Sequence, residues 1–433
     1  MNALPKPQGI RTRPHVLCIG GEDHALRVPF LLALRERGFQ VSAAATADPA
    51  PFARAGIDYY PFQFDRFIAP LADLTACKAL AKLIADVRPE IVQSFDTKPD
   101  LLVPLAAGRI PGVNIVCTIN GLAYLYSSRS PKALLLRPIW RALQRIAARS
   151  TTVTVFQNVD DQTFFERYGM TGRSAKRLIP GSGVDVDRFD QAVATGPSPE
   201  ELRHTLGLGG CETIVTVSRM TRQKGIPTLL EAAAEVHRHR PGVRFLLVGP
   251  RDSEGPLAVT QNEIDRHKPY VLALGPRSDV PSLLAIADVF ALPTEYREGI
   301  PRALLEAAAA SRPIVTTRMP GCRDVIRDGW NGYLVAPHSP RQLAGRILDL
   351  LRDRETAGVM GTRAATLVRS EFSLEVIVER YASLYEELIN RSLQKRMKLG
   401  VEGLERDLCQ DSAPQFGIAH LDITLACRSG ARF

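Results

Sequence analysis

The pattern that most constrains the fold is an alternation of short β-rich apolar runs with longer helical stretches. Such alternation is typical of parallel sheets, in which each helix crosses back over the sheet to the next strand. Helices are predicted over Arg27–Arg37, which stops at Gly38, and over Asp73–Val87, which stops at Pro89. The strands predicted in this first series are His15–Gly21, Gln40–Thr46, Glu90–Asp96, Asn114–Gly121 and Val153–Asn158.

The same alternation restarts after a segment rich in Pro and Gly at residues 196–210. Helices are expected over Ile226–His239 and Arg302–Ala310. The pattern therefore predicts an α/β fold of two facing Rossmann-like, doubly wound parallel-sheet domains, with ligands at the carboxyl ends of the strands in an interdomain cleft. The strands of the second series are Ile214–Met220, Val243–Gly249, Val271–Gly275, Val289–Thr294 and Pro313–Thr317.

A chain of 433 residues is long enough for two domains of ordinary size. Few apolar positions recur periodically near the C-terminal end, where we expect disorder or loose packing. The predicted parts are an N-terminal tail (1–13), an N-terminal Rossmann-like domain (14–195), a C-terminal Rossmann-like domain (196–370), a helix packing back on the first domain (371–392) and a tail of unknown role (393–433).

Composition narrows the class of protein. No apolar run approaches the roughly 20 residues of a membrane-spanning helix, and the first apolar run is too short for a signal peptide, so we expect a cytoplasmic protein. The seven cysteines are an odd number without metal-ligand spacing, which indicates a reducing compartment and no structural zinc. The net charge of +9 favours an anionic partner, which nucleic acid, phospholipid or a phosphorylated substrate would each satisfy.

Residues 292–317 form the most informative segment, in which a strand leads through a loop into a helix. We expect Pro301 in the first helical turn, followed by backbone N–H groups that can hold a diphosphate. Glu298 precedes that helix and Glu306 lies inside it, so one carboxylate can meet a sugar and the other a ribose. Taken alone, the two acids are better explained as solvated charges near a helix start.

A second segment, residues 214–233, also runs from a strand through a loop into a helix, and its loop is basic. Arg219 and Lys224 are placed there to neutralise a diphosphate leaving group. Acids from one loop and cations from the other thus share one sheet edge, which favours a sugar-nucleotide site.

These motifs resemble family 4 of the retaining glycosyltransferases, through EGIPRALLE, SRMTRQKG and GCRDVIRDGWNGYLV, and the resemblance spans residues 14–390. It implies the B-type glycosyltransferase fold, retention of anomeric configuration and no essential metal. It also implies Arg219 and Lys224 on the donor diphosphate, Glu306 on the ribose and Glu298 beside the donor sugar. Further donor-binding positions are Gly299, Ile300 and Pro301. Gly20 and Gly21 follow the first strand, where glycine lets the backbone approach a phosphate or sugar closely, although a tight turn explains them about as well.

Five N-terminal segments, among them FDRFIAPLADL (64–74) and FQNVDDQTFF (156–165), resemble the subgroup that acts on polyprenyl-diphosphate-linked saccharides, such as N-acetylgalactosaminyltransferases of surface glycan assembly. Many family members carry His where this chain has Asn120. Asn cannot act as a general base, so on the family's front-face route the departing phosphate takes the acceptor proton and Asn120 hydrogen-bonds the sugar. Asp96 and Lys98 at a strand end are acceptor-side candidates, although a helix cap or a surface charge explains each equally well.

The stretch 122–150 contains no acidic residue and carries six basic ones. Arg137, Arg141 and Arg145 recur every four residues in an amphipathic helix suited to anionic lipid, and Tyr124 adds an interfacial aromatic. The alternative is a surface helix whose apolar side packs on the sheet. No nucleic-acid-binding motif accompanies the charge.

The sequence thus predicts a bacterial enzyme that moves a hexose or N-acetylhexosamine from a UDP-sugar to a lipid-linked saccharide at the inner face of the cytoplasmic membrane. The UDP-sugar is a co-substrate, and no cofactor or metal is expected. Two alternatives are a UDP-sugar 2-epimerase-like isomerase and an inactive sugar-nucleotide-binding scaffold.

Overall fold

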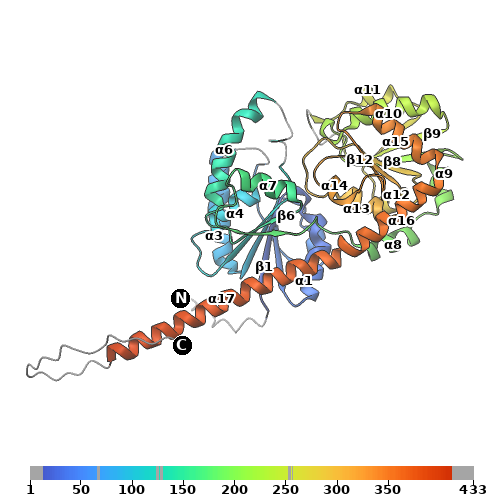
Figure 1. Cartoon of the computed structure of the whole chain (residues 1–433). Helices are drawn as coiled ribbons and strands as arrows, with labels where there is room; N and C mark the ends of the chain where they lie inside the picture. The colour runs from blue at the N-terminus through green and yellow to red at the C-terminus, as the bar shows by residue number, and fades with distance from the viewer. Residues whose placement is uncertain are drawn as a thin grey trace, which may run out of the picture. The chain divides into compact units, whose positions relative to one another are not determined.

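The computed structural model describes residues 13–65, 69–122, 126, 130–251, 255 and 257–411. Residues up to Glu386 form one compact unit, and residues from Glu387 onward belong to a second. The first unit holds two parallel sheets with helices packed against them (Figure 1). The predicted fold class, two doubly wound α/β domains, is confirmed.

The first sheet has seven parallel strands in the order β3-β2-β1-β4-β5-β6-β7. All five predicted strands are present, each ending one or two residues before its predicted end. Two further strands, β3 and β7, were not predicted. The strands are β1 (His15–Gly20), β2 (Gln40–Ala45), β3 (Asp58–Pro61), β4 (Ile91–Phe95), β5 (Asn114–Ile119), β6 (Val153–Phe156) and β7 (Ala175–Leu178).

The second sheet has six parallel strands in the order β10-β9-β8-β11-β12-β13. The short strand β13 is again an addition to the predicted set. The strands are β8 (Glu212–Val217), β9 (Val243–Val248), β10 (Val271–Gly275), β11 (Val289–Leu292), β12 (Ile314–Thr317) and β13 (Tyr333–Val335).

Each sheet reverses its strand order at one place, between β1 and β4 in the first and between β8 and β11 in the second. At such a switch point the helices on the two sides cover opposite faces, and the two loops at the carboxyl ends separate to leave room for a ligand. The loops that follow β1, β4, β8 and β11 are therefore the places where the fold favours a site.

Helices fill the connections of the first sheet, and α3, α4 and α6 pack together in sequence on one of its faces (Figure 1). The predicted helix over Arg27–Arg37 is a 3-10 turn followed by a shorter α-helix. The elements are η1 (Glu22–Arg27), α1 (Val28–Glu36), α2 (Ala50–Arg54), α3 (Pro70–Val87), α4 (Pro99–Ala107), α6 (Pro131–Ala147), α7 (Val159–Arg167) and α8 (Val186–Thr195).

In the second domain, the helix predicted over Ile226–His239 has those bounds, and the helix predicted over Arg302–Ala310 ends one residue earlier. The elements are α9 (Pro199–Thr205), η2 (Arg222–Lys224), α10 (Ile226–His239), α11 (Gln261–Asp265), α12 (Val280–Ala285), α13 (Arg302–Ala309), α14 (Cys322–Val325), α15 (Pro340–Arg352) and α16 (Arg354–Glu371).

The long helix α17 (Leu374–Asp411) begins by packing on the first domain. The Tyr381 hydroxyl lies 2.9 Å from the Thr118 Oγ1, and the Tyr385 hydroxyl donates to the Gln93 Oε1 at 2.8 Å. Both tyrosines are fully buried. The backbone stays helical through Asp411, which differs from the disorder, though not from the loose packing, that the sequence predicted as alternatives from residue 393. No helix of the described residues is long and apolar enough to cross a membrane.

Candidate functional site

The loops after β8 and β11 meet at the second switch point. The Lys224 Nζ lies 2.6 Å from the Glu298 Oε2, and their side chains are only 12% and 17% exposed. Gly225 makes this approach possible, since its φ is +71° and a Cβ there would lie 1.9 Å from the Pro293 carbonyl oxygen. The basic and the acidic loop are thus joined by a shielded ion pair.

The other Glu298 oxygen accepts a hydrogen bond from the Thr294 hydroxyl at 3.1 Å. Arg219 lies two residues after the end of β8 and is half-buried, five residues before Lys224. Its carbonyl accepts the N–H of Thr221 at 2.8 Å, which fixes the turn into η2. Arg219, Lys224 and Glu298 therefore lie on loops at one edge of the sheet.

Glu306 lies one turn inside α13, where its Oε1 accepts from the Arg302 Nε at 2.8 Å. The carboxylate is 19% exposed and keeps a second oxygen for a ligand. Pro301 is the N-cap of this helix, with ψ 120°, whereas the sequence predicted it in the first turn. The first helical residue is Arg302.

Two amides that the sequence assigned to the donor bind the first domain instead. The Gly299 N–H donates to the Asn120 carbonyl at 2.9 Å, and the Ile300 N–H donates to the Gln157 Oε1 at 3.0 Å. Gly121 and Glu298 form an antiparallel bridge beside them. The Glu298 loop therefore pairs with the residues that follow β5 and β6.

Asn120 and Asp96 lie at the carboxyl edge of the first sheet. The Asn120 Nδ2 donates to the Asp96 Oδ1 at 3.0 Å, and the Gly21 N–H donates to the Asp96 Oδ2 at 3.1 Å. Asp96 has a φ of +77°, which is uncommon for a residue other than glycine and is often found at functional sites. These contacts join the loops of the first switch point.

Gly20 has a packing role in this arrangement. A Cβ there would lie 2.1 Å from the His24 Nδ1, so the absent side chain makes room for the imidazole. His24 is 1% exposed and stacks on Phe52. Burial, reinforced by Arg27 and opposed by Asp96, lowers the His24 pKa to about 3.

Lys98 holds two segments of the first domain together. Its Nζ lies 2.6 Å from the Asp73 Oδ1 at the start of α3, and it also donates to the Asp65 carbonyl. This ion pair gives Lys98 a structural partner, in addition to any role toward an acceptor. Tyr124 lies outside the described residues.

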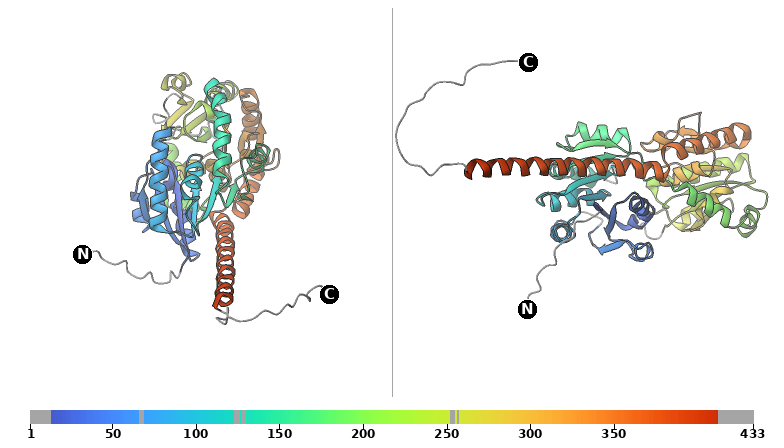
Figure 2. Two further views of the ribbon diagram at one scale, coloured as in Figure 1. Left: turned by 90° about the vertical axis from the view of Figure 1, so that its left-hand side faces the viewer. Right: turned by 90° about the horizontal axis from the view of Figure 1, so that it is seen from below.

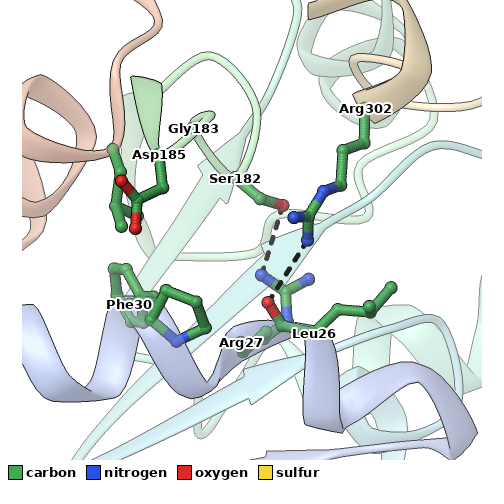
Figure 3. Close-up of a pocket in the computed structure, with 9 residues that line it drawn as sticks. Leu26, Arg27, Phe30, Ser182, Gly183, Asp185 and Arg302 are labelled. Carbon is green, nitrogen blue, oxygen red and sulfur yellow. Dashed lines mark hydrogen bonds between the residues drawn. The ribbon is translucent and has the colours of Figure 1, made fainter. Parts of the chain in front are cut away.

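A small pocket lies beside α1, α13 and the start of α17 (Figure 3). The Arg27 guanidinium stacks 3.7 Å above the Phe95 ring and donates to the Ser182 Oγ at 3.3 Å. Arg302 points into the same space and donates to the Leu26 carbonyl at 3.4 Å. Through these hydrogen bonds, η1 contacts the segment that follows β7 and the start of α13.

Several apolar residues of the helix α6 are exposed, which differs from the alternative in which the apolar side of this helix packs on the sheet. Leu134, Leu135, Ile139 and Ile146 are 45–75% exposed. The Arg141 guanidinium lies 3.8 Å above the Tyr168 ring, and the Arg145 Nη2 donates to the Tyr168 carbonyl at 2.8 Å.

The third predicted basic residue of this helix packs in the same way, because the Arg137 guanidinium lies 5.2 Å from the centre of the Tyr126 ring. The side of α6 that carries Leu135 and Ile139 does not pack on the sheet. Two of the three arginines lie over tyrosine rings, and the third holds a backbone carbonyl.

Sequence reasoning missed Gln157 and Asp161. Asp161 is buried and its Oδ1 lies 3.3 Å from the Arg297 Nη2, next to Glu298. Burial raises its pKa to about 6, against a hydrogen bond from Asn158 and the charge of Arg297. The signal was available in FQNVDD, where polar residues directly follow a strand of a parallel sheet.

The described residues contain no cluster of His, Cys, Asp or Glu that could hold a metal ion.

Two sheets whose switch-point loops carry these contacts define a two-domain glycosyltransferase fold of the B type. A solved glycosyltransferase from Rickettsia africae matches with a TM-score of 0.71 and 19% identity, covering 87% of this chain and 99% of that chain. Anabaena HepE in complex with UDP-glucose matches with a TM-score of 0.69 and 21% identity, covering 86% and 99%. At these identities the likeness concerns the fold.

Two family models match the sequence, Glycosyltransferase Family 4 over residues 30–188 and Glycosyl transferases group 1 over residues 211–353. Together they span most of both domains, and the chain belongs to family 4 of the glycosyltransferases. It is therefore a glycosyltransferase.

Among curated proteins, the chain is 24% identical over 375 residues to the Campylobacter jejuni N,N'-diacetylbacillosaminyl-diphospho-undecaprenol alpha-1,3-N-acetylgalactosaminyltransferase, covering 86% of this chain and 97% of that protein. It is 25% identical over 328 residues to the Escherichia coli UDP-Gal:alpha-D-GlcNAc-diphosphoundecaprenol alpha-1,3-galactosyltransferase, covering 75% and 82%.

Proposed function

We propose that this glycosyltransferase moves a hexose or N-acetylhexosamine from a UDP-sugar to a polyprenyl-diphosphate-linked saccharide, with retention of configuration. The observation that carries the proposal is the ion pair between Lys224 and Glu298, whose Nζ and Oε2 atoms lie 2.6 Å apart. The backbone of Glu298 also pairs with that of Gly121 in the first domain. A cation for the diphosphate and an acid for the sugar thereby lie next to Asn120, the residue proposed to meet the acceptor.

In the proposed reaction, the bond from the anomeric carbon to the β-phosphate breaks and a bond to the acceptor hydroxyl oxygen forms. Arg219 and Lys224 stabilise the negative charge that develops on the departing diphosphate. Glu298 accepts a hydrogen bond from a sugar hydroxyl, and Glu306 accepts from the ribose. The acceptor proton passes to the departing diphosphate, so Asn120 is needed only as a hydrogen-bond donor.

The proposed acceptor rests on the two undecaprenyl-diphosphate-specific relatives and on the exposed apolar side of α6. Leu135 is 75% exposed near the start of α6, and Leu71 is 84% exposed at the start of α3. Helices that follow parallel strands begin at the carboxyl edge of the sheet, so both leucines lie at the edge that carries Asp96 and Asn120. The two helices are seen on the same face in the left view of Figure 2.

We further propose that this edge rests on the inner face of a bacterial cytoplasmic membrane. Apolar side chains inserted at the lipid boundary and adjacent arginines facing anionic headgroups are the two components of interfacial binding. A membrane-bound enzyme would meet the saccharide of a lipid-linked acceptor at the same edge.

The test is incubation of the purified protein with a panel of UDP-sugars and an undecaprenyl-diphosphate-linked saccharide, followed by mass measurement of the lipid product. The proposal predicts a gain of one hexosyl or N-acetylhexosaminyl residue with at least one donor. Conversion of the UDP-sugar to an epimer without acceptor would identify an isomerase. Binding of UDP with no product from any donor would identify an inactive binding protein. Either outcome overturns the proposal.

A further inference from the structure

Gln157 connects the two domains at the proposed site. It directly follows β6 and is 4% exposed. Its Nε2 donates to the Asn120 Oδ1 at 2.7 Å, and its Oε1 accepts the Ile300 N–H at 3.0 Å. One side chain thus contacts both the acceptor-side amide and the loop that carries Glu298.

These hydrogen bonds have a fixed direction. The Ile300 N–H can only donate, so the oxygen of Gln157 must face it and the NH₂ group must face Asn120. At the other end, the Asp96 carboxylate can only accept when ionised, so Asn120 turns its NH₂ group to Asp96 and its oxygen to Gln157. The hydrogen bonds at both ends of this series, to Ile300 and to Asp96, therefore impose the same orientation on the Asn120 amide.

Glycines leave space for this contact. A Cβ at Gly299 would lie 1.9 Å from the Gln157 Oε1, and a Cβ at Gly121 would lie 2.6 Å from the Glu298 Cα. Any side chain at either position would push the Glu298 loop away from the first domain. The close contact with Gln157 thus depends on both glycines.

We propose that Gln157 is a positioning residue for sugar transfer. It turns the Asn120 amide so that the second N–H of Nδ2 is presented to a substrate hydroxyl, and it holds the Glu298 loop at the distance the reaction needs. Among the described residues, the Asn120 Nδ2 donates only to Asp96, which leaves that second N–H available. This inference rests on the proposed function.

The test compares Gln157→Leu and Gln157→Glu with the wild type in the transfer assay, alongside UDP affinity and unfolding of each protein. Gln157→Leu removes both hydrogen bonds and should lower kcat about tenfold to a hundredfold. UDP affinity should stay within about twofold, because the nucleotide contacts proposed for Arg219, Lys224 and Glu306 are untouched.

Gln157→Glu supplies the specific readout. The ionised carboxylate still accepts from Ile300 but meets the Asn120 oxygen as a second acceptor, whereas the protonated carboxyl group can donate as the amide does. The ratio of Gln157→Glu activity to wild-type activity should therefore rise as pH falls, while the ratio for Gln157→Leu stays flat. A purely structural role would alter stability without this pH dependence.

Gln144→Leu is the matched control, since Gln144 is a buried glutamine of α6 whose Nε2 has no hydrogen-bond partner among the described residues. It should leave kcat unchanged. Wild-type kcat in Gln157→Leu, or a pH-independent ratio for Gln157→Glu, would overturn the inference while wild-type transfer still supports the proposed function. Absence of transfer by the wild type would instead reject the proposed function.

Discussion

Lys224 and Glu298 form a shielded ion pair between the loops that follow β8 and β11, with 2.6 Å between Nζ and Oε2. The pair exists because these two strands are neighbours at the switch point of their sheet, although the residues are 74 positions apart. Each charge therefore has the other as its partner in the folded protein. A diphosphate would give Lys224 a second anion to neutralise.

The first prediction concerns this pair. Lys224→Met and Glu298→Gln should be non-additive in the free energy of unfolding, with a coupling of about 1–3 kcal/mol, because each single change leaves one shielded charge unpaired. Urea unfolding of the four proteins measures the coupling. Lys224→Met combined with Glu306→Gln is the control and should be additive, since the partner of Glu306 is Arg302. Additivity in the first cycle would show that the pair is not formed.

The second prediction separates two roles of Gly20. Gly20→Ala should cost about 1–3 kcal/mol of stability, because its Cβ would collide with the buried His24 ring. Adding His24→Ala should recover part of that loss. Gly242→Ala, at a position with open space, is the control.

UDP-sugar affinity of the double variant then decides the function of Gly20. Unchanged affinity assigns Gly20 to packing, whereas a large loss assigns it to contact with the donor. A Gly20→Ala protein as stable as the wild type would contradict the collision itself.

The third prediction is a pH dependence of stability. The His24 pKa is lowered to about 3, so below pH 6.5 His24 binds a proton in the unfolded chain but not in the folded protein. Stability is therefore lost as pH falls from 6.5 toward 3, by up to about 1.4 kcal/mol per pH unit from this residue. The free energy of unfolding of His24→Leu, measured from pH 7.5 to 5, should fall less steeply than that of the wild type. Parallel curves would contradict the lowered pKa.

The fourth prediction tests membrane docking through α6. Leu135→Ser with Ile139→Ser should reduce binding to vesicles containing anionic phospholipid at least tenfold. Burial of each of these exposed side chains at the lipid boundary contributes on the order of 1 kcal/mol to the free energy of binding. Serine at Arg137, Arg141 and Arg145 should weaken binding mainly at low salt. Val359→Ser, at an exposed apolar position on α16, should have no effect. Equal co-sedimentation of all four proteins would reject the docking surface.

Most of the sheet core could be predicted from the sequence, because strands such as β1 and β11 are mostly apolar runs bounded by turns. The strands β3 and β7 are partly exposed and only four residues long, so they lack that signal. The sequence did place Lys224 and Glu298 on neighbouring loops. It could not show that Gly299 and Ile300 bind Asn120 and Gln157, because these contacts depend on how the two domains meet.

Which side of α6 is exposed could not be predicted from the sequence either. The arginine spacing is visible in the sequence, but the Tyr126 and Tyr168 rings that Arg137 and Arg141 cover come from the segment before the helix and from the end of α7. Those rings hold the Arg137 and Arg141 guanidinium groups, while Arg145, Leu135 and Ile139 stay exposed. A periodic pattern gives two faces of a helix without saying which one the fold covers.

The most direct test of the account is the turnover of Arg219→Ala and Lys224→Ala in the transfer assay, with folding verified by unfolding curves. If these side chains neutralise the departing diphosphate, each variant should lose about a hundredfold or more in kcat. Wild-type turnover in either folded variant would contradict the role of its side chain at the diphosphate.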